Sequence, residues 1–215
     1  MKRLPVIAID GPAASGKGTI ARRIAAGLGF DHLDTGLLYR GVGMAVIAAG
    51  KDPADAVAAT AAAQGFNPDW LDDPLLRSDV AGPAASKVAA VPAVREALLA
   101  FQRRFALAPP GGRGAVLDGR DIGTVICPDA DVKLYVTATA EIRARRRYLE
   151  LAAQGSPLTQ ADVLADIEAR DRRDMSRPVA PLGQAPDAHL LDTSDLDIET
   201  AVARAFSIVR AAIGT

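Results

Sequence analysis

A glycine-rich segment near the start of the 215-residue chain holds the residues whose types and spacing point most directly to chemistry. It reads Gly11-Pro12-Ala13-Ala14-Ser15-Gly16-Lys17-Gly18-Thr19. Glycines at both ends let such a loop wrap so that backbone N–H groups point at phosphate oxygens, and a following helix adds its positive amino-terminal end. A lysine directly after the second glycine reaches the β- and γ-phosphates of a nucleoside triphosphate. We therefore predict that the whole segment binds a nucleoside triphosphate.

The hydroxyl that usually follows this lysine is displaced by one position. Gly18 stands where Ser or Thr is usual, and Thr19 comes just after it. We expect Thr19 to belong to the shell of a Mg²⁺ ion, in direct contact or through a water. Asp118 lies immediately before Gly119, at the end of a predicted strand, where such proteins place a carboxylate near the metal. A turn cap is the alternative role for Asp118.

The elements on either side of the glycine-rich segment fit a phosphate-binding role. Pro5 to Asp10 is a nearly continuous apolar run, typical of a parallel strand buried on both faces. From Gly16 to Leu28 the apolar residues recur at helical spacing, and Gly29 is a plausible stop. A strand, a glycine-rich turn and a helix in this order favour a phosphate loop over a simple turn.

The rest of the chain alternates between strand and helix patterns. A second helix is predicted over 35–49, with Thr35 as its N-cap, and a last helix over about 196–213. Short strands are predicted at 115–117, 132–136 and 190–191. This alternation predicts an α/β fold with a parallel sheet covered by helices.

Two stretches depart from the alternation. Residues 51–112 contain seven prolines and a helical piece at about 91–107, which predicts an inserted subdomain of helices and loops. Residues 143–181 predict two helices joined by a turn, with Thr159 and Asp162 as a helix cap.

Composition excludes several functional classes. With 49% apolar and 24% charged residues the chain is typical of a globular protein, and its formal net charge of -1 gives no field that attracts nucleic acid. The apolar run from Val6 to Ile9 ends at Asp10, too early for an export signal, and no apolar stretch approaches 20 residues. Cys127 stands alone and is expected to be a buried small hydrophobe. We predict a cytoplasmic protein with no nucleic-acid or membrane partner.

Several separated segments together resemble the bacterial cytidylate kinases, nucleoside monophosphate kinases of the P-loop kinase class. The segments are Ile9-Asp10-Gly11-Pro12, Asp34-Thr35-Gly36-Leu37-Leu38-Tyr39-Arg40, Ala85-Ser86-Lys87-Val88-Ala89, Leu117-Asp118-Gly119-Arg120-Asp121-Ile122-Gly123-Thr124 and Arg170-Asp171-Arg172-Arg173-Asp174-Met175-Ser176-Arg177. The resemblance spans almost the whole chain. It departs at residues 60–83, which are shorter and less strand-like than the β insert of that family.

The resemblance implies an α/β P-loop kinase fold with a parallel five-stranded sheet flanked by helices, in one domain over 1–215. Its core would be about 1–50, 113–142 and 178–215, its monophosphate-binding insert about 51–112, and its arginine-rich lid about 143–177. It also implies that the nucleoside triphosphate bound by residues 11–19 is ATP, and that its γ-phosphate is transferred to CMP and dCMP, with Mg²⁺, by a monomer active in pyrimidine metabolism.

Catalytic and binding residues follow from the same resemblance. Arg40, Arg120 and Arg177 would hold the acceptor phosphate, since guanidinium groups bind phosphate bidentately; surface ion pairs are the alternative. Lys17, Arg120, Arg177 and Asp118 would carry catalysis by positioning and charge neutralisation, with no catalytic base. The predicted CMP-binding set is Thr35, Tyr39, Arg40, Ser86, Arg95, Arg120, Asp121, Arg170, Asp174 and Arg177.

Within this set, Asp121 would accept a hydrogen bond from the cytosine amino group, and Ser86 and Arg95 would donate to its acceptors. Arg170 and Asp174 would read the sugar, or simply form an intrahelical ion pair. Tyr39 could pack beside the nucleotide or in the core. His32 and His189 show no partners for metal or nucleophilic chemistry, and we expect both at sheet edges.

Two other functions stay open at this point. One is a kinase for a different monophosphate or small metabolite. The other is a nucleotide-dependent switch or assembly ATPase, which hydrolyses ATP without a small acceptor. The cluster of acceptor arginines weighs against the second.

Overall fold

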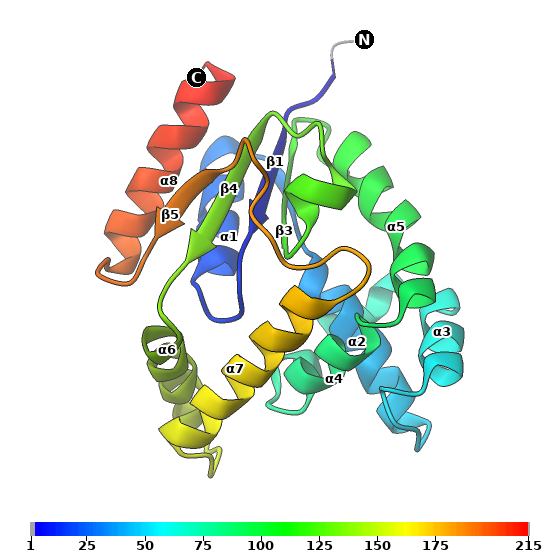
Figure 1. The fold of residues 1–215 in the computed structure, drawn as a ribbon. Helices are drawn as coiled ribbons and strands as arrows, with labels where there is room; N and C mark the ends of the chain where they lie inside the picture. Colours follow the sequence, from blue (N-terminus) through cyan, green and yellow to red (C-terminus); the bar gives the residue numbers. More distant parts are fainter. Residues whose placement is uncertain (1–2, 215) are drawn as a thin grey trace.

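The computed structural model describes residues 3–214, which fold around one five-stranded parallel sheet (Figure 1). Its strands are β1 (Val6–Asp10), β2 (Asp31–Asp34), β3 (Ala115–Gly119), β4 (Val132–Thr137) and β5 (His189–Asp192). They lie in the order β2-β3-β1-β4-β5, and every neighbouring pair is parallel. The predicted five-stranded parallel sheet is confirmed.

The edge strands differ from the central ones in how much they bury. All residues of β1 and β3 are buried, which explains their apolar runs. In β2 only Leu33 is buried, so its sequence carries no apolar run, and the strand was not predicted. His32 lies in β2 and His189 in β5, which confirms that both histidines are at sheet edges.

Helices cover both faces of the sheet. On one face α1 (Lys17–Leu28) and α8 (Ile198–Ile213) pack through residues such as Ile20, Ile24 and Val209 against Val116 and Leu134. On the other face α5 (Pro92–Leu107) and the π-helical turn η3 (Ile122–Ile126) cover β1 and β3. The helices α1, α5 and α8 begin within two residues of the predicted starts and end where predicted.

A second apolar cluster lies below the sheet in Figure 1. It joins α2 (Thr35–Ala48), α3 (Ala56–Gln64), α4 (Ala81–Val88) and α5. Gly43 allows α2 and α4 to approach closely, because a Cβ there would lie 2.9 Å from the Ala84 Cβ. The segment over 60–83 contains no strand; it holds the end of α3, the 3₁₀ turns η1 (Pro68–Asp72) and η2 (Pro74–Arg77), and the start of α4. This agrees with the weak strand pattern there, while the division into core, insert and lid stays a prediction.

The arginine-rich stretch forms two helices, α6 (Ala140–Ala153) and α7 (Gln160–Ser176), as predicted. They pack through Ala144, Leu151, Val163 and Ile167. The predicted cap of α7 is confirmed as a capping box between Thr159 and Asp162.

Two local expectations were wrong. The N-cap of α2 is Asp34, whose carboxylate accepts a hydrogen bond from the Gly36 N–H at 2.9 Å, while the Thr35 hydroxyl donates to the Asp118 carbonyl at 2.8 Å. Thr35 does not cap α2 because its hydroxyl is hydrogen-bonded to the Asp118 carbonyl on β3. Cys127 is only partly buried, although that burial raises the pKa of its thiol to about 11.

Within residues 3–214, no helix combines the length and apolarity needed to span a bilayer.

Candidate active site

The glycine-rich loop joins β1 to α1, as the sequence predicts. Only glycine fits at position 11, because a Cβ there would lie 1.9 Å from the Val136 carbonyl oxygen. Gly16 has a φ of 89°, in the left-handed region that glycine adopts without strain, and serves as N-cap of α1. The helix therefore begins with its positive amino-terminal end directed at the loop, the arrangement that binds phosphate.

A cavity of about 660 Å³ opens over this loop. Lys17, Thr19 and the other loop residues from 14 to 19 form one wall. Its cationic side chains are Lys17, Arg22, Arg40, Arg77, Arg146 and Arg147, and its acidic side chains are Asp34, Glu150 and Asp197. The excess of cations and the volume suit a nucleoside triphosphate.

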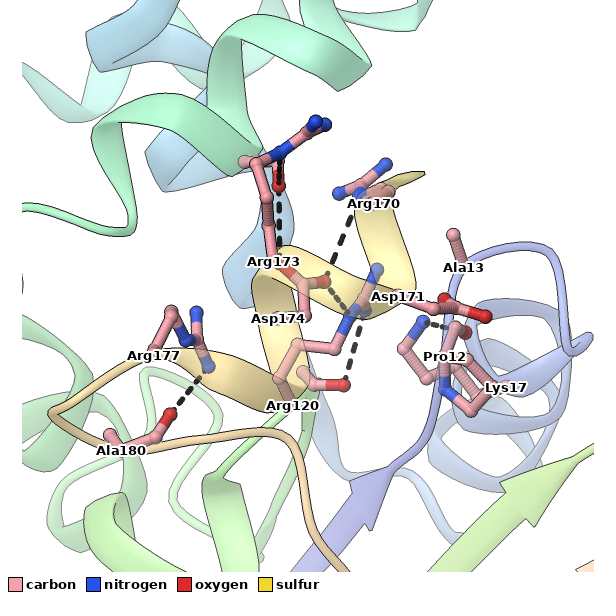
Figure 2. Close-up of polar contacts among 12 residues, drawn as sticks. Pro12, Ala13, Lys17, Arg120, Arg170, Asp171, Arg173, Asp174, Arg177 and Ala180 are labelled. Carbon is pink, nitrogen blue, oxygen red and sulfur yellow. Dashed lines mark hydrogen bonds and ion pairs between the residues drawn. The ribbon is translucent and has the colours of Figure 1, made fainter. Parts of the chain in front are cut away.

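Lys17 is buried in the cavity wall, with its Nζ atom 3.2 Å from the Pro12 carbonyl oxygen (Figure 2). Burial lowers the pKa of its ammonium to about 7, and the nearby Arg120 charge acts in the same direction. The lysine therefore lacks a full counter-charge, which a bound polyphosphate would supply.

We expect ATP binding to draw a proton onto Lys17. At about pH 8 the empty site holds largely neutral lysine, and triphosphate oxygens favour the ammonium. Calorimetric titrations in two buffers of different ionisation enthalpy should therefore show proton uptake. The Lys17→Met variant should show none, and equal uptake in both proteins would contradict the assignment.

A second, smaller cavity lies between α2, α4, α5 and α7. Its lining includes Thr35, Tyr39, Ser86, Arg95, Arg120, Asp121, Arg170, Asp174 and Arg177. The structure thus brings together every residue of the predicted CMP-binding set except Arg40. Arg40 lines the larger cavity, where its Nη1 donates to the Leu76 carbonyl at 2.6 Å. The smaller cavity leaves only about 30 Å³, so a nucleotide enters only if side chains move.

Asp174 is the main anion among the arginines of this cavity (Figure 2). It accepts hydrogen bonds from Arg120 Nε at 3.0 Å and from the Ser86 hydroxyl at 3.2 Å. Arg170 Nε, one helical turn away on α7, lies farther from Asp174, at 3.8 Å. The intrahelical ion pair considered from the sequence is therefore only one of the contacts of Asp174. Burial acts to raise the pKa of Asp174, but the Arg120, Arg170 and Arg177 charges hold it below its ordinary value.

Asp121 is paired with Arg95, and both side chains are buried. The Arg95 guanidinium lies 5.4 Å from the centre of the Tyr39 ring. Tyr39 also belongs to the apolar cluster of α2, so it serves both the core and the cavity. Burial raises the pKa of its phenol.

Several buried donors in this cavity have no hydrogen-bond partner among residues 3–214. They are Tyr39 Oη, Arg170 Nε and Arg177 Nε. Buried polar groups in native proteins are nearly always hydrogen-bonded. Donors that lack a hydrogen bond and gather around one cavity indicate that an anionic or polar ligand completes it.

The sequence analysis did not find a polar pair between His32 of β2 and Asp118 of β3. His32 Nε2 lies 2.7 Å from Asp118 Oδ2, because the parallel register pairs His32 with Val116 and so places Asp118 on the same face. The other carboxylate oxygen of Asp118 faces the phosphate loop, 3.7 Å from where a Cβ on Gly18 would lie. Only a register assignment for β2 could have found this pair.

Comparison with known proteins shows the family of the chain. A family model described as cytidylate kinase matches residues 7–211. The chain belongs to the cytidylate kinase family. The cytidylate kinase of Paramagnetospirillum magneticum is 61% identical over 204 residues, covering 95% of this chain and 97% of the relative. That of Rhodopseudomonas palustris is 59% identical over 206 residues, 96% of each chain.

Solved structures agree with this cytidylate kinase family assignment at the level of the fold. An uncharacterised protein from Eubacterium ventriosum superposes with a TM-score of 0.56 at 13% identity, covering 98% of this chain and 99% of its own. A sugar kinase from a Janibacter species superposes with a TM-score of 0.51 at 15% identity, covering 98% and 97%. At these identities the two structures support the α/β fold alone.

Proposed function

We propose that this cytidylate kinase family member transfers the γ-phosphate of ATP to CMP and to dCMP, giving ADP and the nucleoside diphosphate. The adjacency of the two cavities carries the proposal: Asp34 lines the larger cavity and the next residue, Thr35, lines the smaller one, which Arg120 also lines. A donor phosphate on Lys17 and an acceptor phosphate on Arg120 would therefore meet (Figure 2).

The transfer needs positioning more than proton chemistry. An oxygen of the acceptor phosphate attacks the γ-phosphorus, and the bond to the oxygen bridging to the β-phosphorus breaks to release ADP. Lys17 would neutralise charge on the moving group, while Arg40, Arg120 and Arg177 hold the acceptor in line. The acceptor phosphate is already ionised near neutral pH, so no side chain has to remove a proton.

Base selection would depend on a carboxylate in the smaller cavity. Cytosine presents an amino donor where uracil presents a carbonyl acceptor. Asp121 would accept from that amino group, Ser86 and Arg95 would donate to the base, and Arg170 and Asp174 would contact the sugar. The Asp121–Arg95 pair must open or shift to admit the base.

The oxygen donors near the phosphate loop fit a Mg²⁺ ion. Residues 3–214 hold no cluster of three His, Cys, Asp or Glu that could bind a metal alone, which suits an ion taking most of its oxygens from substrate phosphates and water. Thr19 and Asp118 would hold it, and Asp34 lines the same cavity as Thr19. When bound, Mg²⁺ neutralises negative charge on the phosphate oxygens. Burial raises the pKa of Asp34, which a nearby cation would oppose.

One chain supplies every side chain named for the two cavities, so we propose that the monomer is the active unit.

The two rival functions, a kinase for another acceptor and an ATPase, differ in which small acceptor they need. An assay of ADP release with CMP, dCMP, UMP, AMP and shikimate separates them. We expect rapid release with CMP and dCMP. Equal release without an acceptor would support an ATPase, and a better acceptor elsewhere in the panel would support another kinase.

We also expect α6 and α7 to close over the bound nucleotides. Arg143 of α6 donates to the Ala13 carbonyl of the phosphate loop at 3.3 Å, and Arg147 to the Ser78 carbonyl of the insert at 3.5 Å, so this helix pair borders both substrates. Closure excludes water from the reacting phosphates. Amide hydrogen exchange over 140–176 should slow with CMP and a non-hydrolysable ATP analogue together, while α3 stays unchanged. Equal exchange with and without ligands would contradict a moving lid.

A further inference from the structure

Asp10 is a buried carboxylate that the phosphoryl transfer itself does not use. It ends β1, is 4% exposed, and points at the turn that follows β3. Its Oδ1 accepts a hydrogen bond from the Ile122 N–H and its Oδ2 from the Gly123 N–H, both at 2.7 Å. Burial raises the pKa of Asp10 to about 7, and the two N–H groups act in the opposite direction by stabilising the carboxylate.

These two N–H groups are the first of the π-helical turn η3. Such N–H groups have no partner within their own helix and need an outside acceptor. The residue at the N-cap of η3 is Asp121, and aspartate is one of the residues that most often cap the helix they precede. Yet Asp121 makes no cap bond and instead pairs with Arg95 in the smaller cavity, which under the proposed function is the acceptor cavity.

The packing around Asp10 holds this arrangement tightly. A Cβ added to Gly123 would lie 3.4 Å from Asp10 Oδ2 and 3.1 Å from the Lys133 Cδ atom. The Lys133 methylene groups thus pack beside Gly123, while the Lys133 ammonium pairs with Asp187 at 2.8 Å. The Ile122 and Gly123 N–H groups are therefore both bonded to Asp10 in this packed surrounding.

We propose that Asp10 is a positioning residue for base recognition: by occupying the Ile122 and Gly123 N–H groups, it takes the Gly123 donor that Asp121 could otherwise cap and leaves that carboxylate in the acceptor cavity. The inference rests on the proposed CMP kinase function and on Asp121 as the residue that accepts a hydrogen bond from the cytosine base. It assigns base selectivity to a residue that never touches the base.

The Asp10→Asn variant tests this directly. The amide keeps the size of the side chain but presents an N–H group to one of the two backbone donors, which frees that donor for Asp121. We expect the ratio of kcat/KM for CMP to that for UMP to fall roughly tenfold, the effect of about one lost hydrogen bond. The change should appear in KM for CMP, with KM for ATP unchanged.

A matched control is Asp31→Asn. Asp31 Oδ2 likewise accepts a backbone N–H bond, from Gly111 at 2.6 Å, but lines neither cavity. Its CMP to UMP ratio should equal that of the wild type. Gly123→Ala keeps the carboxylate at position 10 and crowds the same contact, so it should lower the ratio in the same direction, and it serves if Asp10→Asn does not fold.

A double variant separates positioning from general damage. If Asp10 acts through Asp121, adding Asp10→Asn to Asp121→Asn should lower the ratio no further. An unchanged ratio in both Asp10→Asn and Gly123→Ala, or losses that multiply in the double variant, would overturn the inference. Failure of the proposed function would look different, because wild-type protein would then show no preference for CMP.

Discussion

Replacing Lys17 by alanine should lower kcat for phosphoryl transfer by at least roughly 10²- to 10³-fold, the usual cost of removing one charge-stabilising donor from a transferring group. The ammonium is buried in the wall of the larger cavity, and its one hydrogen bond within residues 3–214 goes to the Pro12 carbonyl. Its charge is therefore available to the phosphate. Because the side chain lines an open cavity, truncation leaves no sealed void, and the melting temperature should stay close to that of the wild type.

Two further variants sharpen this result. Lys17→Arg keeps the charge but replaces a point charge with a planar fork, so it should restore only part of the activity. Lys87→Ala removes an exposed lysine that pairs with Asp52, and should leave kcat unchanged. Near-normal turnover by Lys17→Ala, together with a normal melting curve, would remove Lys17 from the mechanism.

The Asp121→Asn variant should lower the ratio of kcat/KM for CMP to that for UMP by roughly tenfold to a hundredfold, or about 1 to 3 kcal/mol. The carboxylate accepts from the cytosine amino group and opposes the uracil carbonyl, whereas an amide can turn to donate to uracil. The measurement is kcat/KM for both nucleotides in both proteins.

Asp52→Asn is the control, since Asp52 is an exposed carboxylate that pairs with Lys87 and lines neither cavity. Its ratio should match the wild type. If the ratio is also unchanged in Asp121→Asn, the carboxylate does not read the base. Its role would then be to orient Arg95, its partner in this structure.

The phosphate loop could be predicted from sequence because its function is local. The glycines, Lys17 and the start of α1 are contiguous, and their spacing alone dictates a turn that directs N–H groups at an anion. The apolar runs of β1 and β3 are equally local, since a strand buried on both faces must be apolar throughout. The edge strand β2 buries one residue and leaves no such pattern.

The acceptor cavity could be named only through the family resemblance. Ser86, Asp121 and Asp174 are far apart in sequence, and nothing in their local patterns says that α4, η3 and α7 meet. Their partners were also beyond sequence reasoning. Asp174 lies nearer to Arg120 at the end of β3 than to Arg170 on its own helix, because packing between elements outweighs helical spacing.

The sequence by itself determined the phosphate loop, the alternation of strands and helices, and the ends of α1, α2, α5 and α8 to within two residues, because each depends on residues close together in the chain. The tertiary structure alone decided which acceptor each polar group would use. Asp34 caps α2 while Thr35 turns to the Asp118 carbonyl, and Asp10 takes the Gly123 N–H group that Asp121 could have capped. These choices depend on strand register and on which side chains arrive from distant elements, since several acceptors of similar chemistry compete for each donor.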